Sequence, residues 1–393
     1  MILFINEKLD GFGFQWINNN QNSFWYTLDR DLHDASEVRW HVMYNLTVLK
    51  IISFGMDWYW SLNKIQKLDV SKHECQQCSN KEICYKVRQE QNQSPSNFTF
   101  SAYLGYLLYV PLLIAGPTTT FNAWISHIKK AQTTYSKKRI CLYVLRTALI
   151  FLSFEIFIHI SKSFAFLTNE KNKYLTSQIS VPTLCIMSLA ALMFIWYKFL
   201  SIWRFFRCWA LLDGIETPEN MNRCICNNYC FEGFWRSWHR SFNQWLIRYI
   251  FIPCGGSKYK QYNIWVVFTF VAFWHDINIS LMVWAWVICL SLIPEIIVKA
   301  YFNQKKFDYI WGQYWFIFLC LLTGSFYITL MILANMIGFA SGVQGTGGIL
   351  DRLQTIDGFL GYLKFLFCLI PFTSLQFYIR DQEQKQSKNL KGM

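Results

Sequence analysis

Eight apolar runs dominate this sequence, and most are long enough to cross the roughly 30 Å hydrocarbon core of a membrane as a helix. They cover residues 40–62, 100–121, 140–164, 177–198, 263–274, 281–298, 313–338 and 357–379. Charged residues make up only 16% of the chain, below the roughly one quarter found in soluble domains. The pattern predicts an all-α, multispan transmembrane protein. Run 263–274 is too short to cross without tilt, so we also expect short re-entrant or interfacial helices.

The segments that flank these runs are polar. Residues 1–39 carry several acidic side chains and show no cleavable signal peptide. We therefore expect a polar N-terminal segment, a membrane-embedded domain over residues 40–380 and a basic tail over residues 381–393. Membrane insertion would then depend on the first internal span, or on an N-terminal part of the protein that precedes this sequence.

The net charge of +13 comes largely from Lys and Arg in short loops between apolar runs, which is the membrane pattern. The chain has no compact basic domain and no zinc-finger or RNA-binding signature, which argues against nucleic acid as a partner. If all eight runs cross in turn, the tail shares one side with loops 122–139, 199–262 and 299–312. That side is richer in Lys and Arg and is expected to be cytosolic, which places loop 63–99 in the lumen. Glycosylation sequons at Asn92 and Asn97 agree with a lumenal loop.

Loop 63–99 also contains the motif His73-x-Cys75-x2-Cys78-x5-Cys84. One histidine and three cysteines make a four-ligand set for a structural zinc ion. A lumenal, oxidising compartment instead favours a disulfide with one cysteine left over. Reduced, unpaired thiols are a third alternative, and the sequence leaves all three open.

A second informative segment, residues 234–245, reads FWRSWHRSFNQW. Its aromatic side chains recur every three or four residues, which is the stripe of an amphipathic helix; they are Trp235, Trp238, Phe242 and Trp245. His239 and Asn243, four residues apart, share another line of that helix, and Arg236 and Arg240 form a third. Such a helix is expected to lie at the membrane surface, with its tryptophans as interfacial anchors.

His275 is the strongest candidate for catalysis, because it follows the apolar run 266–274. An ionisable side chain at membrane depth is costly and usually functional, and apolar neighbours favour the neutral imidazole that acts as a base. The alternative is a buried histidine hydrogen-bonded to a backbone carbonyl. Asn243 and His239 are candidates for binding the oxygen that becomes negative in acyl transfer, and the alternative for each is a polar residue facing the interface. No serine or cysteine lies in a nucleophile-elbow context, which favours direct transfer.

These features together resemble the membrane-bound O-acyltransferases, and most closely the Gup branch, the glycerol uptake proteins related to Hedgehog acyltransferase. Besides the segments around His239 and His275, the resemblance rests on blocks 51–57, 109–117 and 213–221, and it covers roughly residues 35–380. Family members usually carry further spans before the Ser53-Phe54-Gly55 block. This chain instead starts with a polar segment, which is expected of a fragment or an incomplete gene model, and the family's N-terminal helices with their share of the tunnel are left open.

The resemblance implies a multispan helical fold whose tunnel meets an active site inside the membrane. It implies acyl-CoA as donor and a hydroxyl, or in some relatives an amine, as acceptor. His275 matches the family's catalytic histidine, and the second catalytic position falls on Asn243 first and His239 second. Within the Gup branch, the implied role is remodelling of the acyl chains of glycosylphosphatidylinositol (GPI) anchors in the endoplasmic reticulum.

We therefore predict an acyl-CoA-dependent O-acyltransferase whose partners are membrane lipids, acyl-CoA and a lipid acceptor such as a lyso-GPI anchor. No bound cofactor and no catalytic metal are expected. Arg236, Arg240 and Arg248 are candidates for contacting the CoA phosphates, with anionic lipid headgroups as the alternative ligand. The rival functions are glycerol transport, which the lack of a visible repeat disfavours, and non-catalytic regulation of acylation, which the retained histidine disfavours.

Overall fold

The computed structural model describes residues 18, 20–27, 30, 40–65, 73, 75, 78, 83–302, 307 and 309–391, and these form helices and loops with no strand. The expected all-α fold is therefore confirmed. The principal helices are α3 (Trp40–Leu62), α5 (Tyr85–Glu90), α6 (Phe100–Leu108), α7 (Val110–Leu113), α8 (Phe121–Lys129), α9 (Lys137–Ile160), α10 (Ser163–Thr168), α11 (Lys173–Thr176), α12 (Val181–Leu212), α13 (Phe231–Ser237), α14 (Arg240–Leu246), α15 (Lys260–His275), α16 (Ile279–Tyr301), α17 (Tyr314–Phe339), α18 (Gly342–Leu353) and α19 (Ile356–Lys391).

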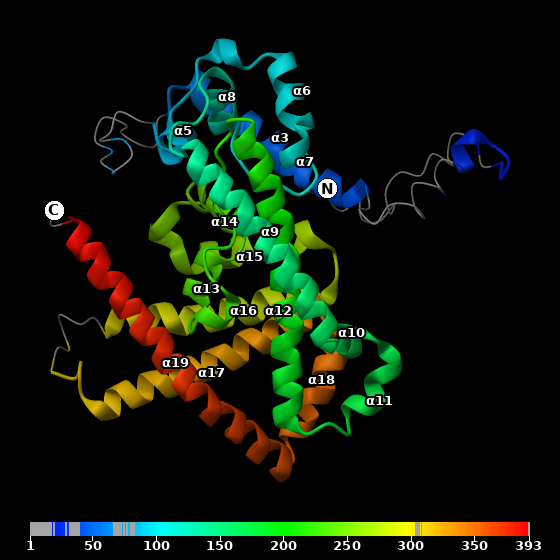
Figure 1. Cartoon of the computed structure of the whole chain (residues 1–393), viewed down its shortest axis with the longest axis vertical. Helices are drawn as coiled ribbons and strands as arrows, with labels where there is room; N and C mark the ends of the chain where they lie inside the picture. The colour runs from blue at the N-terminus through cyan, green and yellow to red at the C-terminus, as the bar shows by residue number, and fades with distance from the viewer. Residues whose placement is uncertain are drawn as a thin grey trace.

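Five of these helices, α9, α12, α16, α17 and α19, are long and apolar enough to cross a membrane. They correspond to five of the eight predicted runs. Ser136 and Ser180 cap the N-termini of α9 and α12 by accepting a hydrogen bond from a backbone N–H of the first turn. In Figure 1, α9 and α12 run side by side, α16 and α17 lie next to each other at the level of the lower half of α12, and α19 lies against α17. The helices α3 and α15 form where expected, but neither is one of these five.

The apolar run 100–121 does not form one span, contrary to the prediction. Helix α6 ends at Leu108, and Pro111 occupies the first turn of α7 because it has no N–H to donate within a continuous helix. A Cβ on Gly116 would lie 2.1 Å from the Pro111 carbonyl oxygen, so the turn after α7 requires glycine at residue 116. The run therefore folds as the short helices α6 and α7, and α8 begins at its end.

This break changes the predicted topology, because loops 63–99 and 122–139 contact each other. The guanidinium of Arg88 donates to the carbonyl oxygens of Ser126 at 3.0 Å and Lys130 at 2.7 Å. The ammonium of Lys129 donates to Asn97 Oδ1 at 2.5 Å. The two loops therefore share one side of the membrane, and the predicted placement of loop 63–99 opposite loop 122–139 is wrong. Since loop 122–139 is strongly basic, the positive-inside bias now favours a cytosolic position for both loops.

Glycosylation tags test this topology directly. Tags inserted with a spacer at Ser96 and at Ser136 should both stay unmodified, whereas a tag at Ser177, between α11 and α12, should be glycosylated, because α9 separates it from the other two. The measurement is the gel shift removed by an endoglycosidase. A modified tag at Ser96 beside an unmodified tag at Ser136 would contradict the shared side.

The two flanking segments are described to different extents. Most of the predicted N-terminal segment 1–39 lies outside the described residues. The predicted tail 381–393 is, up to Lys391, the last part of α19. It is anchored there by an ion pair of 2.7 Å between Glu383 and Arg223, in the loop after α12. The basic tail is thus a helical extension of the membrane domain.

Candidate active site

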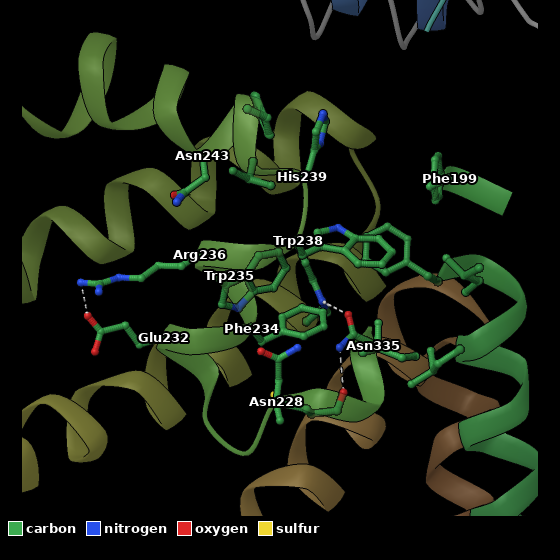
Figure 2. A pocket seen from close by; sticks show the side chains of 18 of the residues that line it. Phe199, Asn228, Glu232, Phe234, Trp235, Arg236, Trp238, His239, Asn243 and Asn335 are labelled. Carbon is green, nitrogen blue, oxygen red and sulfur yellow. Dashed lines mark hydrogen bonds and ion pairs between the residues drawn. The ribbon is translucent and has the colours of Figure 1, made fainter. Parts of the chain in front are cut away.

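A cavity of about 1340 Å³ lies between α12, α13, α14, α15, α16, α17 and α19. Its wall is mostly apolar and aromatic, and it includes Trp203, Trp235, Trp238, Trp274 and Trp284. The polar side chains on this wall include His239, Asn243, His275 and Asn335. Figure 2 shows His239 and Asn243 above Trp235 and Trp238, and Asn335 below them. A long apolar cavity with a few polar groups suits a ligand with an extended hydrocarbon part and a polar reactive end.

His275 is the last residue of α15, and its side chain is accessible from the cavity. Three aromatic rings surround the imidazole, with centroid distances of 4.8 Å to Trp274, 6.2 Å to Trp284 and 5.4 Å to Phe339. Within the described part of the chain no hydrogen bond engages this imidazole, so the alternative of a histidine satisfied by a backbone carbonyl is not observed there. The ring is held by packing, and its nitrogens remain available to a ligand.

The end of α15 is fixed to α3 by a reciprocal pair of hydrogen bonds. Trp274 Nε1 donates to the Asn45 carbonyl oxygen at 2.9 Å, and Asn45 Nδ2 donates to the Trp274 carbonyl oxygen at 3.0 Å. The Trp274 ring also packs on Phe242, with centroids 4.5 Å apart. Because these contacts bury the residue next to His275, they fix the position of the histidine without using its side chain.

Residues 234–245 do not form one continuous helix, contrary to the prediction. Helix α13 ends at Ser237 and α14 begins at Arg240, and His239 between them adopts the left-handed conformation with φ 42° and ψ 49°. This conformation is costly for a residue with a Cβ and persists only where surrounding contacts enforce it. A non-glycine residue held in this region at the edge of a cavity is typical of functional sites.

Asn220, from block 213–221, holds this turn. Its carbonyl oxygen accepts from the Arg240 N–H at 3.1 Å, and its Oδ1 accepts from the Ser241 N–H at 3.0 Å. The Ser241 hydroxyl in turn accepts from the Thr118 N–H at 2.8 Å, just after Gly116-Pro117. Block 213–221, through Asn220, and Thr118, the residue after block 109–117, therefore act as a scaffold for the turn at His239.

The aromatic residues of this segment are not interfacial anchors, which corrects the second prediction made for it. Phe242 and Trp245 are 4% and 2% exposed and belong to the main apolar core, and Trp235 and Trp238 pack against that core. The indole of Trp245 also donates to the Leu49 carbonyl oxygen of α3 at 3.2 Å. The stripe faces protein because α3, α15 and α16 cover it.

The break also separates the two candidate polar residues. His239 precedes α14 and stacks on Trp203 of α12, with ring centroids 4.3 Å apart and an interplanar angle of 22°. Asn243 lies within α14. They do not share one line of a continuous helix, but both line the cavity (Figure 2).

Arg248 is buried and paired with two acidic side chains, which contradicts its predicted contact with phosphates. It is 3% exposed and forms ion pairs with Asp57 of α3, at 3.1 Å, and with Glu90 of α5. Tyr249 donates to the same Asp57 carboxylate at 2.9 Å, and the Ser53 hydroxyl lies 2.8 Å from the Tyr249 hydroxyl. Block 51–57 thus fixes the π-helical turn Ile247–Phe251 to α3.

The other two arginines differ in position. Arg236 lines the cavity and pairs with Glu232 at 2.7 Å, with its side chain 74% exposed. Figure 2 shows this pair at one edge of the cavity. Arg240 is not among the residues of the cavity wall, considering the described residues. Of the three predicted phosphate contacts, only Arg236 is therefore placed to meet a ligand of this cavity.

Several residues of the site were not identified from the sequence. Trp203 supports His239, Asn220 clamps its turn, and Asn335 of α17 accepts a hydrogen bond from Trp284 Nε1 at 3.4 Å within the cavity wall. A signal existed for Asn335, since a polar residue in an apolar span is costly and rarely accidental. Trp203 carried no such signal, because it is one of 18 tryptophans in this chain.

Comparison with known proteins identifies the family of this chain. The profile of MBOAT, the membrane-bound O-acyltransferase family, matches residues 9–343. Membrane-bound O-acyltransferase gup1 of Schizosaccharomyces pombe is 34% identical over 358 residues, which are 90% of this chain and 60% of that protein. Membrane-bound O-acyltransferase GUP1 of Saccharomyces cerevisiae is 35% identical over 397 residues, 99% of this chain and 67% of the relative.

A more distant similarity extends to Protein-cysteine N-palmitoyltransferase HHAT of Mus musculus, which is 25% identical over 189 residues, 46% of this chain and 37% of that protein. The chain thus spans about 60% of the length of the first of these relatives.

Proposed function

Since the chain belongs to the membrane-bound O-acyltransferase family, we propose that it transfers a fatty acyl chain from acyl-CoA to a lipid hydroxyl. The observation that carries this proposal is the cavity of about 1340 Å³, whose wall is mostly apolar and aromatic and whose polar residues include His239, Asn243 and His275. The apolar wall accommodates the acyl chain, and the polar group meets its thioester end.

In the proposed mechanism, the neutral imidazole of His275 accepts the proton of the acceptor hydroxyl as the oxygen attacks the thioester carbonyl. The carbonyl oxygen becomes an oxyanion, and a neighbouring polar side chain stabilises it by donating a hydrogen bond. Collapse of the intermediate breaks the carbon–sulfur bond, and the leaving thiolate takes the proton back from His275. The products are an ester and free CoA, and His275 returns to its neutral form.

For the second polar residue we now place His239 before Asn243, which reverses the order expected from the sequence. Three observations support this choice. His239 has a strained backbone that several hydrogen bonds maintain, its ring stacks on Trp203, and it lines the cavity as His275 does. Asn243 lines the same cavity from within a regular helix, and its position requires no strained backbone. Strain is retained where it positions a functional group.

For the nucleotide end of acyl-CoA we propose the edge of the cavity at Arg236. A smaller hollow of about 140 Å³ adjoins this edge and is lined by Arg236, Lys299 and Arg380. Glu232 also lies there and pairs with Arg236 at 2.7 Å and with Lys299 at 3.1 Å. Lys299 also pairs with Glu295 at 2.5 Å, and Arg380 with Glu383 at 3.5 Å. A phosphate would therefore replace some of these ion pairs, and phosphate oxygens are strong acceptors for Arg and Lys.

Replacing Arg236 with alanine should raise the KM for acyl-CoA about tenfold, the effect of one charge-assisted hydrogen bond, with little change in kcat. Steady-state kinetics of the purified protein over a range of acyl-CoA concentrations measures both constants. Arg240→Ala is the matched control, because Arg240 is four residues away and outside the cavity wall; its KM should stay unchanged. Equal effects of the two substitutions would contradict a specific role for Arg236.

As acceptor we propose the lipid of a GPI anchor in the endoplasmic reticulum, on the strength of the similarity to the Gup proteins. The test has two arms. Purified protein in detergent is assayed for CoA release that depends on a hydroxyl-bearing lipid. Lipid mass spectrometry then compares the GPI anchors of cells that lack the protein with cells in which it is restored. Lipid-dependent CoA release with unchanged anchors would keep the acyltransferase and reject this acceptor; glycerol flux in reconstituted vesicles without CoA release would reject the enzyme.

A further inference from the structure

Outside the cavity, the structure brings together four side chains of loop 63–99. The ligand atoms of His73, Cys75, Cys78 and Cys84 all lie within 4.8 Å of one another. A tetrahedral zinc ion with Zn–S bonds of about 2.3 Å separates its sulfur ligands by about 3.8 Å. The four groups are therefore already close to the spacing that a single zinc ion imposes.

Two local contacts orient these ligands. The Cys78 N–H donates to Cys75 Sγ at 3.4 Å, which is a hydrogen bond that stabilises a thiolate. His73 Nε2 lies 3.4 Å from Cys84 Sγ, so the imidazole nitrogen that would bind a metal faces the sulfurs. Cys84 is buried and the other three are partly buried. Buried or half-buried thiols with their sulfurs facing one point are typical of structural metal sites.

A disulfide explains this arrangement less completely. Three cysteines form at most one disulfide, which leaves one thiol and His73 without a role, whereas zinc uses all four groups. The contacts of Arg88 and Lys129 also place this loop beside the basic loop 122–139, on the side that the positive-inside bias assigns to the cytosol. Thiols in that compartment stay reduced.

We propose that His73, Cys75, Cys78 and Cys84 bind one structural zinc ion. Its consequence for the fold follows from Cys84, which immediately precedes α5. Helix α5 carries Arg88, which binds α8 and the residues after it, and Glu90, which pairs with the buried Arg248. A zinc ion would thus fix the loop at the start of the helix that fastens α8 to the π-helical turn. Figure 1 shows α5 beside α8.

The test is metal analysis of the full chain, purified in detergent through a tag that binds no metal. Inductively coupled plasma mass spectrometry should find about one zinc ion per chain in the wild type. The substitutions Cys78→Ser and His73→Ala should reduce zinc to below about a tenth of that value. His73→Cys, which supplies a four-cysteine set, should retain it. Cys141→Ser, at an exposed cysteine of α9 outside the cluster, is the control and should bind zinc normally.

The wild type alone also decides the question if the ligand variants fail to fold. Protein from cells grown with cobalt in place of zinc should show the thiolate-to-cobalt charge-transfer absorption of a tetrahedral site. Removal of the metal with a chelator should lower the unfolding midpoint of the wild type. Peptide mapping without reductant reports any disulfide. Wild-type protein without metal, whether its cysteines are free or joined as a disulfide, would overturn the proposal. So would zinc that persists in both Cys78→Ser and His73→Ala. None of these residues lines the cavity, so the result does not depend on the acyltransferase assay.

Discussion

Replacing His275 with alanine should reduce acyl transfer by about 10²–10⁴, the usual contribution of a general base. The loss should appear in kcat, because the imidazole acts on the proton that moves in the transition state. The fold should survive, since the neighbouring Trp274 makes the anchoring hydrogen bonds to Asn45 and the His275 side chain makes none among the described residues. Purified variant and wild type are compared by CoA release at saturating acyl-CoA.

A histidine elsewhere in the membrane domain provides the matched control. His159 lies on the exposed face of α9, 3.6 Å from Glu155 and 70% exposed, and it is not part of the cavity wall. His159→Ala should therefore keep full activity and the same expression and detergent solubility as His275→Ala. If His275→Ala retained activity within about twofold of the wild type, the proton would have to leave by another route, and the assignment of the base would be wrong.

The sequence predicted most of the long helices because hydropathy reports them directly. Runs 140–164, 177–198, 281–298, 313–338 and 357–379 correspond to the five membrane-length helices. The prediction of one span over run 100–121 was wrong because the average apolarity of the run conceals Pro111 and the Gly116-Pro117 pair. These residues interrupt the helix, so the run folds as short helices. One missed break then inverted the side assigned to loop 63–99. When loops are assigned to alternate sides of the membrane, one wrongly predicted span reverses the side of every loop on one side of it in the sequence.

Around the cavity, single residues were easier to predict than their surroundings. His275 stood out because an ionisable group in an apolar run has few structural explanations. The stripe of Trp235, Trp238, Phe242 and Trp245 gave the correct apolar residues, but periodicity does not tell whether lipid or protein covers them. The break at His239 depends on Asn220, which lies nineteen residues earlier in the chain. Arg248 was misassigned because its partner Asp57 is 191 residues away. Such long-range pairs leave no local pattern.

The last prediction separates His239 from Asn243, and the backbone at His239 determines which variants are informative. The backbone at residue 239 has φ 42°. An alanine variant would lose the imidazole and keep the backbone strain, so the two effects could not be separated, whereas glycine adopts this conformation freely. His239→Gly should therefore lower the rate by about 10²–10³, the cost of removing one donor to the oxyanion. The relief of backbone strain should offset part of the stacking lost against Trp203, so that the variant stays folded. Asn243→Ala should lower the rate less than about tenfold, as expected for a polar residue of the wall.

Asparagine at residue 239 then tests what the imidazole contributes. Asn tolerates the left-handed region better than other side chains, and its amide donates a hydrogen bond but does not titrate. If His239 acts as a hydrogen-bond donor, His239→Asn should recover part of the activity lost in His239→Gly and keep the pH–rate profile set by His275. If His239 transfers a proton, His239→Asn should be as inactive as His239→Gly, with a changed profile for any remaining rate. A nearly normal His239→Gly beside an inactive Asn243→Ala would restore the order expected from the sequence, because the strained turn would then serve only to position α14.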